Sequence, residues 1–266
     1  MGSSLGLALK KRGVDVEVRA YARRAETRDA ALEVGAADAV FSDPVEAVQG
    51  ADMVVFCVPI LKIPELAKAC LSGLSPEAVL TDVGSTKAEL AILMDGLLAG
   101  TDVVFVGSHP ICGSEQQGIE AGKSNLYKGA VTVVTPQADA VEGTVSEVSN
   151  LWKSVGASVR VMSPETHDEI LATTSHLPHM VAATLVRSVN DGLFCGTGFL
   201  DTTRVAAGSP EVWSDIVQTN APALKSALKV FQEHLDELNS LIDAADGEKL
   251  SAWFATARDK RKELLG

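Results

Sequence analysis

The stretch GSHPICGSE at residues 107–115 contains the best candidate in this chain for acid–base chemistry. It follows the apolar run DVVFV at residues 102–106, which predicts a buried strand. His109 would then lie just past the carboxyl end of a strand, where open α/β sheets bind their ligands. Pro110 fixes one backbone angle beside the imidazole, and Gly113 permits a tight turn after it. A histidine held in this way can accept a proton near neutral pH, although the pattern also fits a histidine that only caps the strand.

Composition and charge narrow the classes of protein to which this chain can belong. Its 266 residues include 46% hydrophobic and 22% charged residues, which is ordinary for a globular protein. The formal net charge of -12 argues against a nucleic-acid-binding surface, so an anionic ligand needs a local cluster of positive groups. We find no apolar run of membrane-spanning length and no basic-then-apolar leader, so we expect no membrane partner.

The cysteines indicate a reducing compartment. They are scattered and contain no CxxC pair, so neither a zinc site nor a disulfide framework is expected. The four positions are Cys57, Cys70, Cys112 and Cys195. A reduced, cytoplasmic protein fits this pattern best.

Strands and helices alternate in the first part of the chain. Apolar, β-branched runs predict strands at residues 14–21, 51–59, 78–83, 102–106, 129–135 and 158–162, with helices between them. This alternation favours an α/β fold with a mostly parallel sheet and helices on both faces. From Pro164 onward the periodicity is helical only, so we expect an α/β domain at 1–163 and an all-α domain at 164–266. Long apolar helix faces of this kind often form a subunit interface, which favours a homodimer through the C-terminal helices.

The start of the chain lacks parts of a dinucleotide-binding unit. Such a unit begins with a strand, followed by G-x-G-x-x-G and a helix. Here the helix is present, with Gly2 in the place of the third glycine and Ser3 or Ser4 as a plausible N-cap, but the first strand is apparently absent. We hypothesise that the native chain begins upstream of Met1. The alternative is that this helix never bound a phosphate.

The residues after the strand predicted at 14–21 bear on the choice of cofactor. The acidic residue that would hold an adenine ribose is missing there, and Arg23 and Arg24 stand in its place. Two arginines suit a 2′-phosphate, so the sequence favours NADP over NAD. The simpler alternative is that both arginines are solvated residues at a helix start.

Several motifs together resemble the prephenate/arogenate dehydrogenases, the enzymes of tyrosine biosynthesis. The resemblance covers the chain from Gly2 to about Arg261 and rests on the order and spacing of its motifs. These are TDVGSTK at 81–87, GSHPICGSE at 107–115, HD at 167–168, SHLPH at 175–179, GFLDTTRVA at 198–206, and Trp213 with Asn220. The resemblance implies a Rossmann-like NAD(P)-binding domain, a helical dimerisation domain, and oxidative decarboxylation of a cyclohexadienol.

By matching position, the resemblance also implies roles for individual residues. His109 would accept the proton of the ring hydroxyl, and Ser85 would hydrogen-bond in the same cluster. Arg204 would pair with the ring carboxylate through two hydrogen bonds, which a lysine does not reproduce. The residues expected to line the substrate pocket are Ser175, His179, Trp213 and Glu115. Those expected at the cofactor are Gly2, Ser3, Arg23, Arg24, Val58, Pro59, Gly84, Ser85 and Lys87.

Each of these side chains also has a simpler structural interpretation. Ser85 could cap the helix that follows it, and Lys87 could begin a solvated helix face. Arg204 could belong to a structural salt bridge, and Trp213 could be a core residue.

A metal site is a further alternative. His176 and His179 share one helical face, and with His167 they could suggest one. No HExxH motif accompanies them, and Pro178 indicates a kink or a helix start, so we expect no metal.

The resemblance leaves three rival functions open. Arogenate, which carries an ammonium group where prephenate has a keto group, could be the substrate. The chain could instead be a cofactor-free dimeric binding protein, inactive because its first strand is absent. A third rival is another hydroxyacid dehydrogenase, which would rely on a lysine in the helical domain; Lys225 and Lys229 are the candidates, and both lie far along the chain from the other motifs.

Overall fold

The computed structural model describes residues 1–113 and 118–266. They form two compact units, Met1–Ala221 and Pro222–Gly266, which are described separately below. The domain boundary predicted near Ser163 differs from this division, because the helices from Pro164 to Thr219 belong to the first unit. That boundary stays a prediction.

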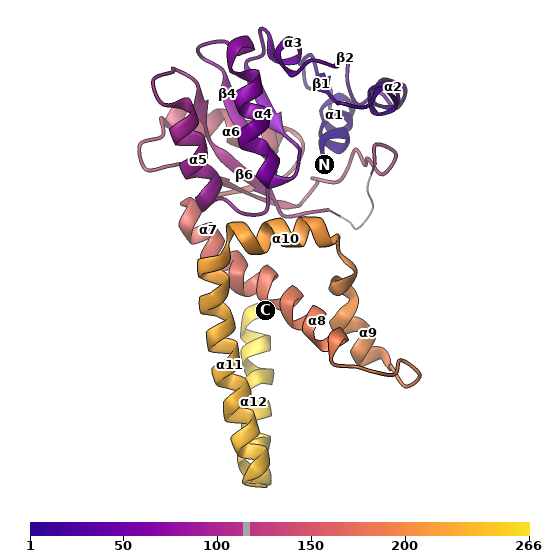
Figure 1. Cartoon of the computed structure of the whole chain (residues 1–266), viewed down its shortest axis with the longest axis vertical. Helices are drawn as coiled ribbons and strands as arrows, with labels where there is room; N and C mark the ends of the chain where they lie inside the picture. Colours follow the sequence, from indigo (N-terminus) through magenta and orange to yellow (C-terminus); the bar gives the residue numbers. More distant parts are fainter. Residues whose placement is uncertain (114–117) are drawn as a thin grey trace. The chain divides into compact units, whose positions relative to one another are not determined.

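The first part of the chain alternates between strands and helices, as the sequence predicts (Figure 1). The strands are β1 (Arg19–Tyr21), β2 (Ala39–Phe41), β3 (Met53–Phe56), β4 (Val79–Asp82), β5 (Val104–Phe105), β6 (Gly107–Pro110), β7 (Val131–Thr135) and β8 (Ser158–Val161). The helices are α1 (Gly2–Lys11), α2 (Ala25–Glu33), α3 (Pro44–Val48), α4 (Ile63–Cys70), α5 (Ala88–Leu98) and α6 (Glu142–Ser154). Short 3₁₀ turns at Ile60–Lys62 and Leu71–Gly73 flank α4.

Three sets of hydrogen-bonded strands are present. β1 pairs with β2, and β3, β4 and β5 pair in that order, all in parallel. The third set begins with β6, which runs antiparallel to β7, while β7 and β8 are parallel. Among the described residues no strand joins β1 to β3, which is where the sequence indicates a missing strand. The hypothesis of an upstream strand stays a prediction.

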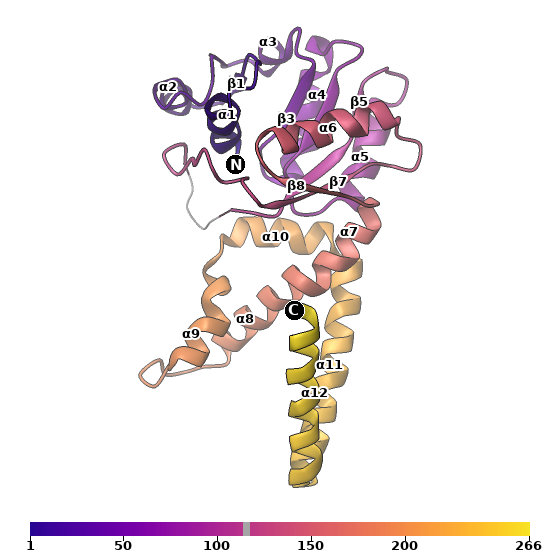
Figure 2. The ribbon, with the colours of Figure 1, turned by 180° about the vertical axis from the view of Figure 1, so that it is seen from behind.

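Helices lie on both faces of the central strands, with α6 on one side and α4 and α5 on the other (Figure 2), and a hydrophobic cluster lies on each face. Leu80 of β4 packs with Ile63 of α4 and Met94 of α5 on one face. Val79, its neighbour in β4, packs with α1 and with Trp152 of α6 on the other face. Successive strand residues point to opposite faces, so the neighbours Val79 and Leu80 are buried on opposite sides of the sheet. The expected α/β layering is therefore confirmed.

Some predicted element bounds were wrong. The predicted strands at 14–21 and 51–59 shorten to β1 and β3, because hydrogen bonding begins and ends inside the apolar runs. His109 was expected past the end of a strand, but it lies within β6, opposite Val133 of β7. The chain continues from β5 across the end of β4, where the Val106 amide donates to the Leu80 carbonyl, and then pairs with β7.

Helices follow β8, as predicted. They are α7 (Pro164–Leu171), α8 (Leu177–Arg187), α9 (Thr197–Thr203) and α10 (Pro210–Thr219), with a π-helical turn at Ala172–His176 and a 3₁₀ turn at Arg204–Ala207. The kink or helix start predicted at Pro178 is confirmed, because the π-helical turn separates α7 from α8. The break precedes Pro178, which has no amide hydrogen to continue the ladder and lies in the first turn of α8.

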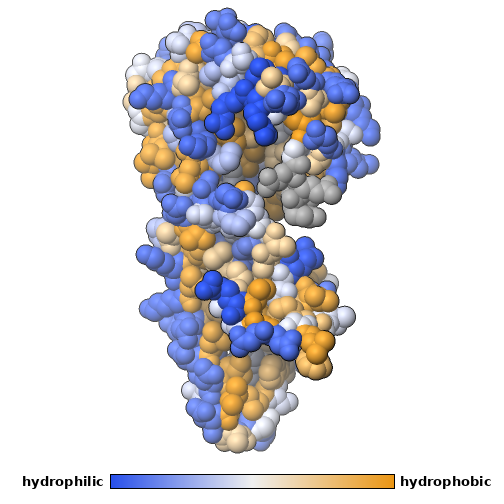
Figure 3. All heavy atoms as spheres, turned by 45° about the vertical axis from the view of Figure 1, so that its right-hand side comes forward, coloured by the Kyte–Doolittle hydropathy of each residue, from blue (hydrophilic) through white to orange (hydrophobic). Residues whose placement is uncertain are grey.

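The second unit consists of α11 (Ala221–Asp243) and α12 (Gly247–Leu265). The two helices lie side by side, and the Trp253 indole donates to Glu237 over 3.3 Å (Figures 1 and 2). Hydrophobic side chains remain exposed along this pair (Figure 3). They include Val230, Leu235, Ile242 and Phe254. None of the described helices is both long enough and apolar enough to cross a membrane.

Candidate active site

Three chain segments meet at the carboxyl edge of β3 and β4. These strands pair in register with Phe56 opposite Asp82, so the segments that follow them emerge next to each other. The first carries Val58, which is half-buried, and Pro59, which is exposed. The amino end of α1 joins them, since a Cβ on Gly2 would lie 3.2 Å from the Cβ of Cys57. The edge is therefore built from a helix N-terminus and two strand ends.

Ser3 and Ser4 do not cap α1, contrary to the prediction. Both residues lie inside the helix, and no side chain caps its first turn. The Ser3 hydroxyl donates to the Ile119 carbonyl over 3.3 Å, and the Ser4 hydroxyl accepts from the Lys123 amide at 3.0 Å. These bonds fasten the segment around residues 119–123 to α1. The uncapped amides leave the α1 terminus suited to an anion.

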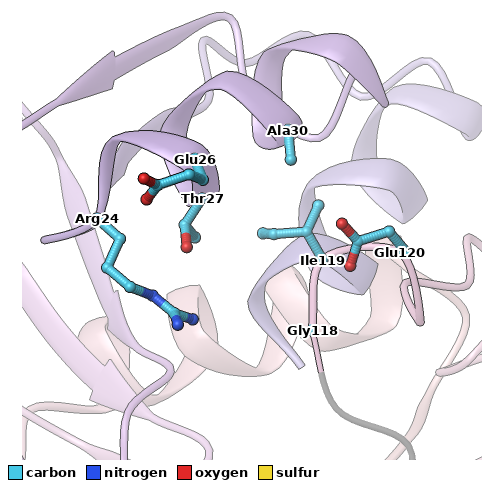
Figure 4. A pocket seen from close by; sticks show the side chains of 7 residues that line it. All are labelled: Arg24, Glu26, Thr27, Ala30, Gly118, Ile119 and Glu120. Atoms are coloured by element: carbon cyan, nitrogen blue, oxygen red, sulfur yellow. The ribbon is translucent and has the colours of Figure 1, made fainter.

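Arg23 and Arg24 are exposed between β1 and α2. Arg24 is the N-cap residue of α2, and neither arginine forms an ion pair within residues 1–113 and 118–266. A shallow pocket of about 260 Å³ lies beside Arg24 and is bounded by α2 and residues 118–120 (Figure 4). It is lined by Arg24, Glu26, Thr27, Ala30, Gly118, Ile119 and Glu120.

A buried ion pair lies beneath the site. Lys87 was considered as a solvated helix-start residue, but it is only 1% exposed. Its ammonium group pairs with the Asp82 carboxylate and donates to the Ser108 carbonyl at 3.0 Å. Asp82 also accepts from the amides of Ser108, at 3.0 Å, and Gly84, at 2.7 Å. Burial lowers the pKa of Lys87, while the adjacent Asp82 charge opposes that shift. The pair thus ties β4 to β6, the strand that carries His109.

At the centre of the site, His109 contacts His167, and His167 in turn contacts Asp168. The His109 Nδ1 atom lies 2.9 Å from Nε2 of His167, and the rings meet edge to face with centroids 5.1 Å apart. The other His167 nitrogen, Nδ1, lies 2.8 Å from the Asp168 carboxylate. Burial lowers the pKa of His109 well below its usual range, and the neighbouring His167, Lys87 and His176 reinforce the shift. His109 is therefore neutral near pH 7.

Asp168 also caps α5. Its carboxylate oxygens accept from the amides of Lys87 and Ala88, each at 2.9 Å. The Asn220 side chain donates to the Asp168 carbonyl at 2.8 Å, which holds the residue from its other side. The interpretation of Ser85 as the cap of α5 is therefore wrong. Ser85 is half-buried in the turn between β4 and α5.

An aromatic cluster forms a second part of the site. The His179 ring stacks on the Trp213 indole with centroids 3.4 Å apart, and His176 meets the same indole edge-on. A Cβ on Gly208 would lie 2.6 Å from the Trp213 nitrogen, so the backbone approaches the indole closely there. Burial lowers the pKa of His179, whose Nδ1 is buried without a partner among the described residues. A buried polar atom of this kind favours a site that receives a ligand or a water.

The three histidines considered as metal ligands have separate partners. His167 contacts His109 and Asp168, His176 contacts the Asn220 side chain at 3.1 Å, and His179 stacks on Trp213. Within residues 1–113 and 118–266, no group of three His, Cys, Asp or Glu side chains could hold a metal ion.

The remaining predicted substrate residues lie on the helical side. Arg204 begins the 3₁₀ turn at Arg204–Ala207, which packs against α8, the helix that carries His179. Arg204 is exposed and, within the part of the chain that the structure describes, has no salt-bridge partner. Ser175 is half-buried in the π-helical turn. Glu115 lies outside the described residues.

Comparisons with known proteins identify both parts of the chain. Residues 5–161 match the family model "Prephenate dehydrogenase, nucleotide-binding domain", and residues 163–256 match "Prephenate dehydrogenase, dimerization domain". The cyclohexadienyl dehydrogenase of Zymomonas mobilis is 33% identical, over 99% of this chain and 92% of that protein. The prephenate dehydrogenase of Bacillus subtilis is 32% identical, over 99% of this chain and 73% of that protein.

Solved structures give the same result. The prephenate dehydrogenase of Aquifex aeolicus, in complex with hydroxyphenyl propionate and NAD+, has a TM-score of 0.91 and 32% identity, covering 99% of this chain and 94% of that one. The arogenate dehydrogenase of Synechocystis has a TM-score of 0.86 and 29% identity, covering 99% of this chain and 96% of that one. With a Rossmann-like nucleotide-binding part followed by helices, this chain belongs to the prephenate dehydrogenase family of oxidoreductases.

Proposed function

We propose that this chain oxidises and decarboxylates prephenate to 4-hydroxyphenylpyruvate and CO2, with a nicotinamide dinucleotide as the hydride acceptor. The observation that carries the proposal is His109, a neutral imidazole in β6 beside the carboxyl edge of β3 and β4. Its Nδ1 faces His167, and its Nε2 has no hydrogen-bond partner among the described residues. A neutral imidazole nitrogen in such a place can accept a proton without leaving a fixed negative charge near an anionic substrate.

The residues at the carboxyl edge fit a dinucleotide. Gly2 and Ser3 begin α1, whose uncapped amides and dipole favour a phosphate. Val58 and Pro59 offer apolar contact after β3, and Gly84 and Ser85 follow β4. A Cβ on Gly84 would lie 2.7 Å from an Asp82 carboxylate oxygen, so the turn packs closely there. The bound nicotinamide would take the hydride from the ring carbon that carries the hydroxyl group.

The protein's own groups would then move one proton and hold the substrate. His109 Nε2 takes the hydroxyl proton as the hydride departs, and the Ser85 hydroxyl hydrogen-bonds beside it. When CO2 leaves, the electrons of its bond make the ring aromatic, and the proton returns from His109 to the phenol oxygen. Before that step, Arg204 would pair with the ring carboxylate. Its guanidinium is available for this contact, because it is exposed and has no ion-pair partner among the described residues.

His179, Ser175 and Trp213 would form the pocket for the substrate side chain. The stacked His179 and Trp213 rings offer a flat wall, and the unpartnered Nδ1 of His179 offers one polar contact. We assign Glu115 to the same pocket, although it lies outside the described residues. An imidazole that donates a hydrogen bond from its Nδ1 suits the keto group of prephenate better than the ammonium group of arogenate.

Arogenate is the second candidate substrate, since a dehydrogenase named for it is among the similar structures. The test is an assay with each substrate and with NAD+ or NADP+, in which the aromatic product and the reduced cofactor are quantified together. Faster conversion of prephenate, with equal amounts of 4-hydroxyphenylpyruvate and reduced cofactor, supports the proposal. A clear preference for arogenate, with tyrosine as the product, would contradict the substrate assignment. The absence of cofactor binding and turnover would favour the inactive binding protein.

We further propose NADP as the preferred cofactor and a homodimer through the C-terminal helices. Arg23 and Arg24 are exposed at the end of β1 and have no described ion-pair partner, so they are available for a 2′-phosphate. The exposed apolar side chains of α11 and α12 favour burial against another chain. Titrations with NADP+ and NAD+ test the first proposal, and the molar mass in solution tests the second.

A further inference from the structure

The protonation of the two linked imidazoles can be worked out from the end of the series. The Asp168 carboxylate accepts the amides of Lys87 and Ala88, so it acts as an acceptor toward its neighbours. An ionised carboxylate has no proton to donate, so the His167 Nδ1 that lies 2.8 Å from it carries a hydrogen. In a neutral imidazole the other nitrogen then has no hydrogen, and His167 Nε2 is an acceptor.

This arrangement determines the tautomer of His109. His109 Nδ1 lies 2.9 Å from the His167 Nε2 acceptor, so His109 donates that hydrogen bond. The remaining ring nitrogen, Nε2 of His109, is left with its lone pair. A histidine that is to accept a proton needs this tautomer, because the other one carries a hydrogen on the reacting nitrogen.

We propose that His167 is a positioning residue, which holds His109 in the tautomer with the hydrogen on Nδ1 and supports it once Nε2 is protonated. The His109–His167 contact joins β6 to α7, residues 58 positions apart in the chain. Asp168 anchors His167 and at the same time caps α5, next to the turn that carries Ser85. The effect of this series on the rate rests on the proposed function, whereas its effect on the tautomer does not.

The charges around His109 fit this role. Burial disfavours a cation on the resting His109, and Lys87 from the start of α5 and His176 from the π-helical turn add to that effect. The Asp82 carboxylate pairs with Lys87, and the Asp168 carboxylate contacts His167. With His167 neutral, a positive charge that forms on His109 during a reaction would be stabilised by the hydrogen bond from its Nδ1 to His167 and by the Asp168 carboxylate beyond it. If His167 were instead a cation in the resting protein, it would donate to His109 and place the hydrogen of His109 on Nε2.

The first measurement is the His109 tautomer in the whole chain, by 15N NMR of the protein labelled at its histidine rings. The His109 signals are assigned by their loss in His109→Asn. The proposal predicts a protonated Nδ1 and an unprotonated Nε2 at pH 7.5. A hydrogen on His109 Nε2 in the unsubstituted protein would overturn it, whether or not the protein turns over prephenate.

Two substitutions of one residue separate positioning from a structural role. His167→Gln places a carbonyl oxygen near the position of Nε2 and keeps an acceptor for His109. His167→Asn places an amide group near the position of Nδ1, so it keeps a donor for Asp168 but loses the contact with His109. We expect kcat to fall about 100-fold in His167→Asn, within the range that a general base contributes, and to be largely restored in His167→Gln. KM and cofactor affinity should change little, and exposed His234→Gln is the matched control for histidine loss.

The pH dependence of kcat/KM provides a further test, because it would not change if His167 had a purely structural role. We expect kcat/KM of the unsubstituted protein to stay constant well below pH 6.5, because His109 remains neutral there. In His167→Asn the His109 ring should populate both tautomers. The pH at which kcat/KM declines on the acid side should therefore shift. The proposal would be overturned if His167→Asn had the same kcat, the same His109 tautomer and the same pH profile as the unsubstituted protein. If the unsubstituted protein converts neither prephenate nor arogenate, the proposed function fails, while the NMR result still decides the role of His167.

Discussion

His176 supplies a quantitative test of how burial controls ionisation in this protein. Its side chain is 1% exposed, and its Nδ1 accepts a hydrogen bond from the Asn220 amide at 3.1 Å. Burial lowers the pKa of His176 from 6.5 to about 4, and the nearby Asp168 offsets only part of the shift. The folded chain therefore binds fewer protons than the unfolded chain between these two values. Stability must fall as the pH drops through this window.

The size of this effect follows from the two pKa values. Between pH 7.5 and pH 5, a shift from 6.5 to about 4 removes about 2 kcal/mol of unfolding free energy. Below pH 4 the folded form also becomes protonated at His176, so the loss from this residue levels off. Other buried histidines add their own contributions, and a comparison of two variants is needed to isolate this one.

The assay is urea unfolding at a series of pH values, with His176→Asn beside the unsubstituted protein. Asparagine keeps an acceptor oxygen near the Asn220 amide but does not titrate. We expect His176→Asn to be less stable at pH 7.5, because packing against Trp213 is lost, and to lose about 2 kcal/mol less on going to pH 5. The exposed His234→Asn is the control and should keep the pH dependence of the unsubstituted protein. An unchanged pH dependence in His176→Asn would refute the reasoning.

Three further variants test the buried pair and the proposed ligand contacts. Lys87→Met leaves the Asp82 carboxylate buried without its cation and should cost about 3 to 5 kcal/mol of unfolding free energy, whereas a loss below 1 kcal/mol would contradict a buried ion pair. Arg204→Ala should raise KM for prephenate about 10- to 100-fold, with the melting temperature retained; an unchanged KM would make Arg204 structural. Replacing Arg23 and Arg24 by alanine should weaken NADP+ binding by at least about tenfold more than NAD+ binding, and equal weakening of both would dismiss the 2′-phosphate contact.

The fold could largely be predicted because its signals are local. Apolar runs such as 51–59 predict buried strands, and the change to helical periodicity after Pro164 predicts the all-helical part. The direction of β6 could not be predicted, because GSHP at Gly107–Pro110 has no strand-forming pattern and pairs with β7, more than twenty residues away. A Cβ at Gly107 would lie 2.6 Å from the Thr135 hydroxyl oxygen, so glycine is required by a contact that the sequence does not reveal.

The sequence allowed individual candidate residues of the site to be predicted, but not the contacts between them. His109 stands out because a proline and a glycine flank it after an apolar run, but the His109–His167 contact joins residues 58 positions apart. Sequence patterns do not show such pairs, because spacing within one element carries no information on distant partners. The alternative interpretation of Lys87 as a solvated helix-start residue is wrong for the same reason. A lysine before a helix usually faces solvent, and here tertiary packing places it beside Asp82.

Ser85 illustrates the opposite error. A serine before a helix commonly caps it, so the local pattern favours that role. Asp168, from a helix much later in the chain, supplies the carboxylate that caps α5 instead. The Ser85 hydroxyl does not cap α5, and the role beside His109 that the family resemblance implies stays a prediction.

The most direct test of the proposed function is the formation of reduced cofactor on addition of prephenate, compared between the unsubstituted chain and His109→Asn. Cofactor binding is measured in parallel, so that a loss of binding is not mistaken for a loss of chemistry. We predict turnover by the unsubstituted chain and a fall in kcat of about 10² to 10⁴ in His109→Asn, with cofactor affinity nearly unchanged. A kcat within a few fold of the unsubstituted value in His109→Asn would contradict the role of His109 as the base.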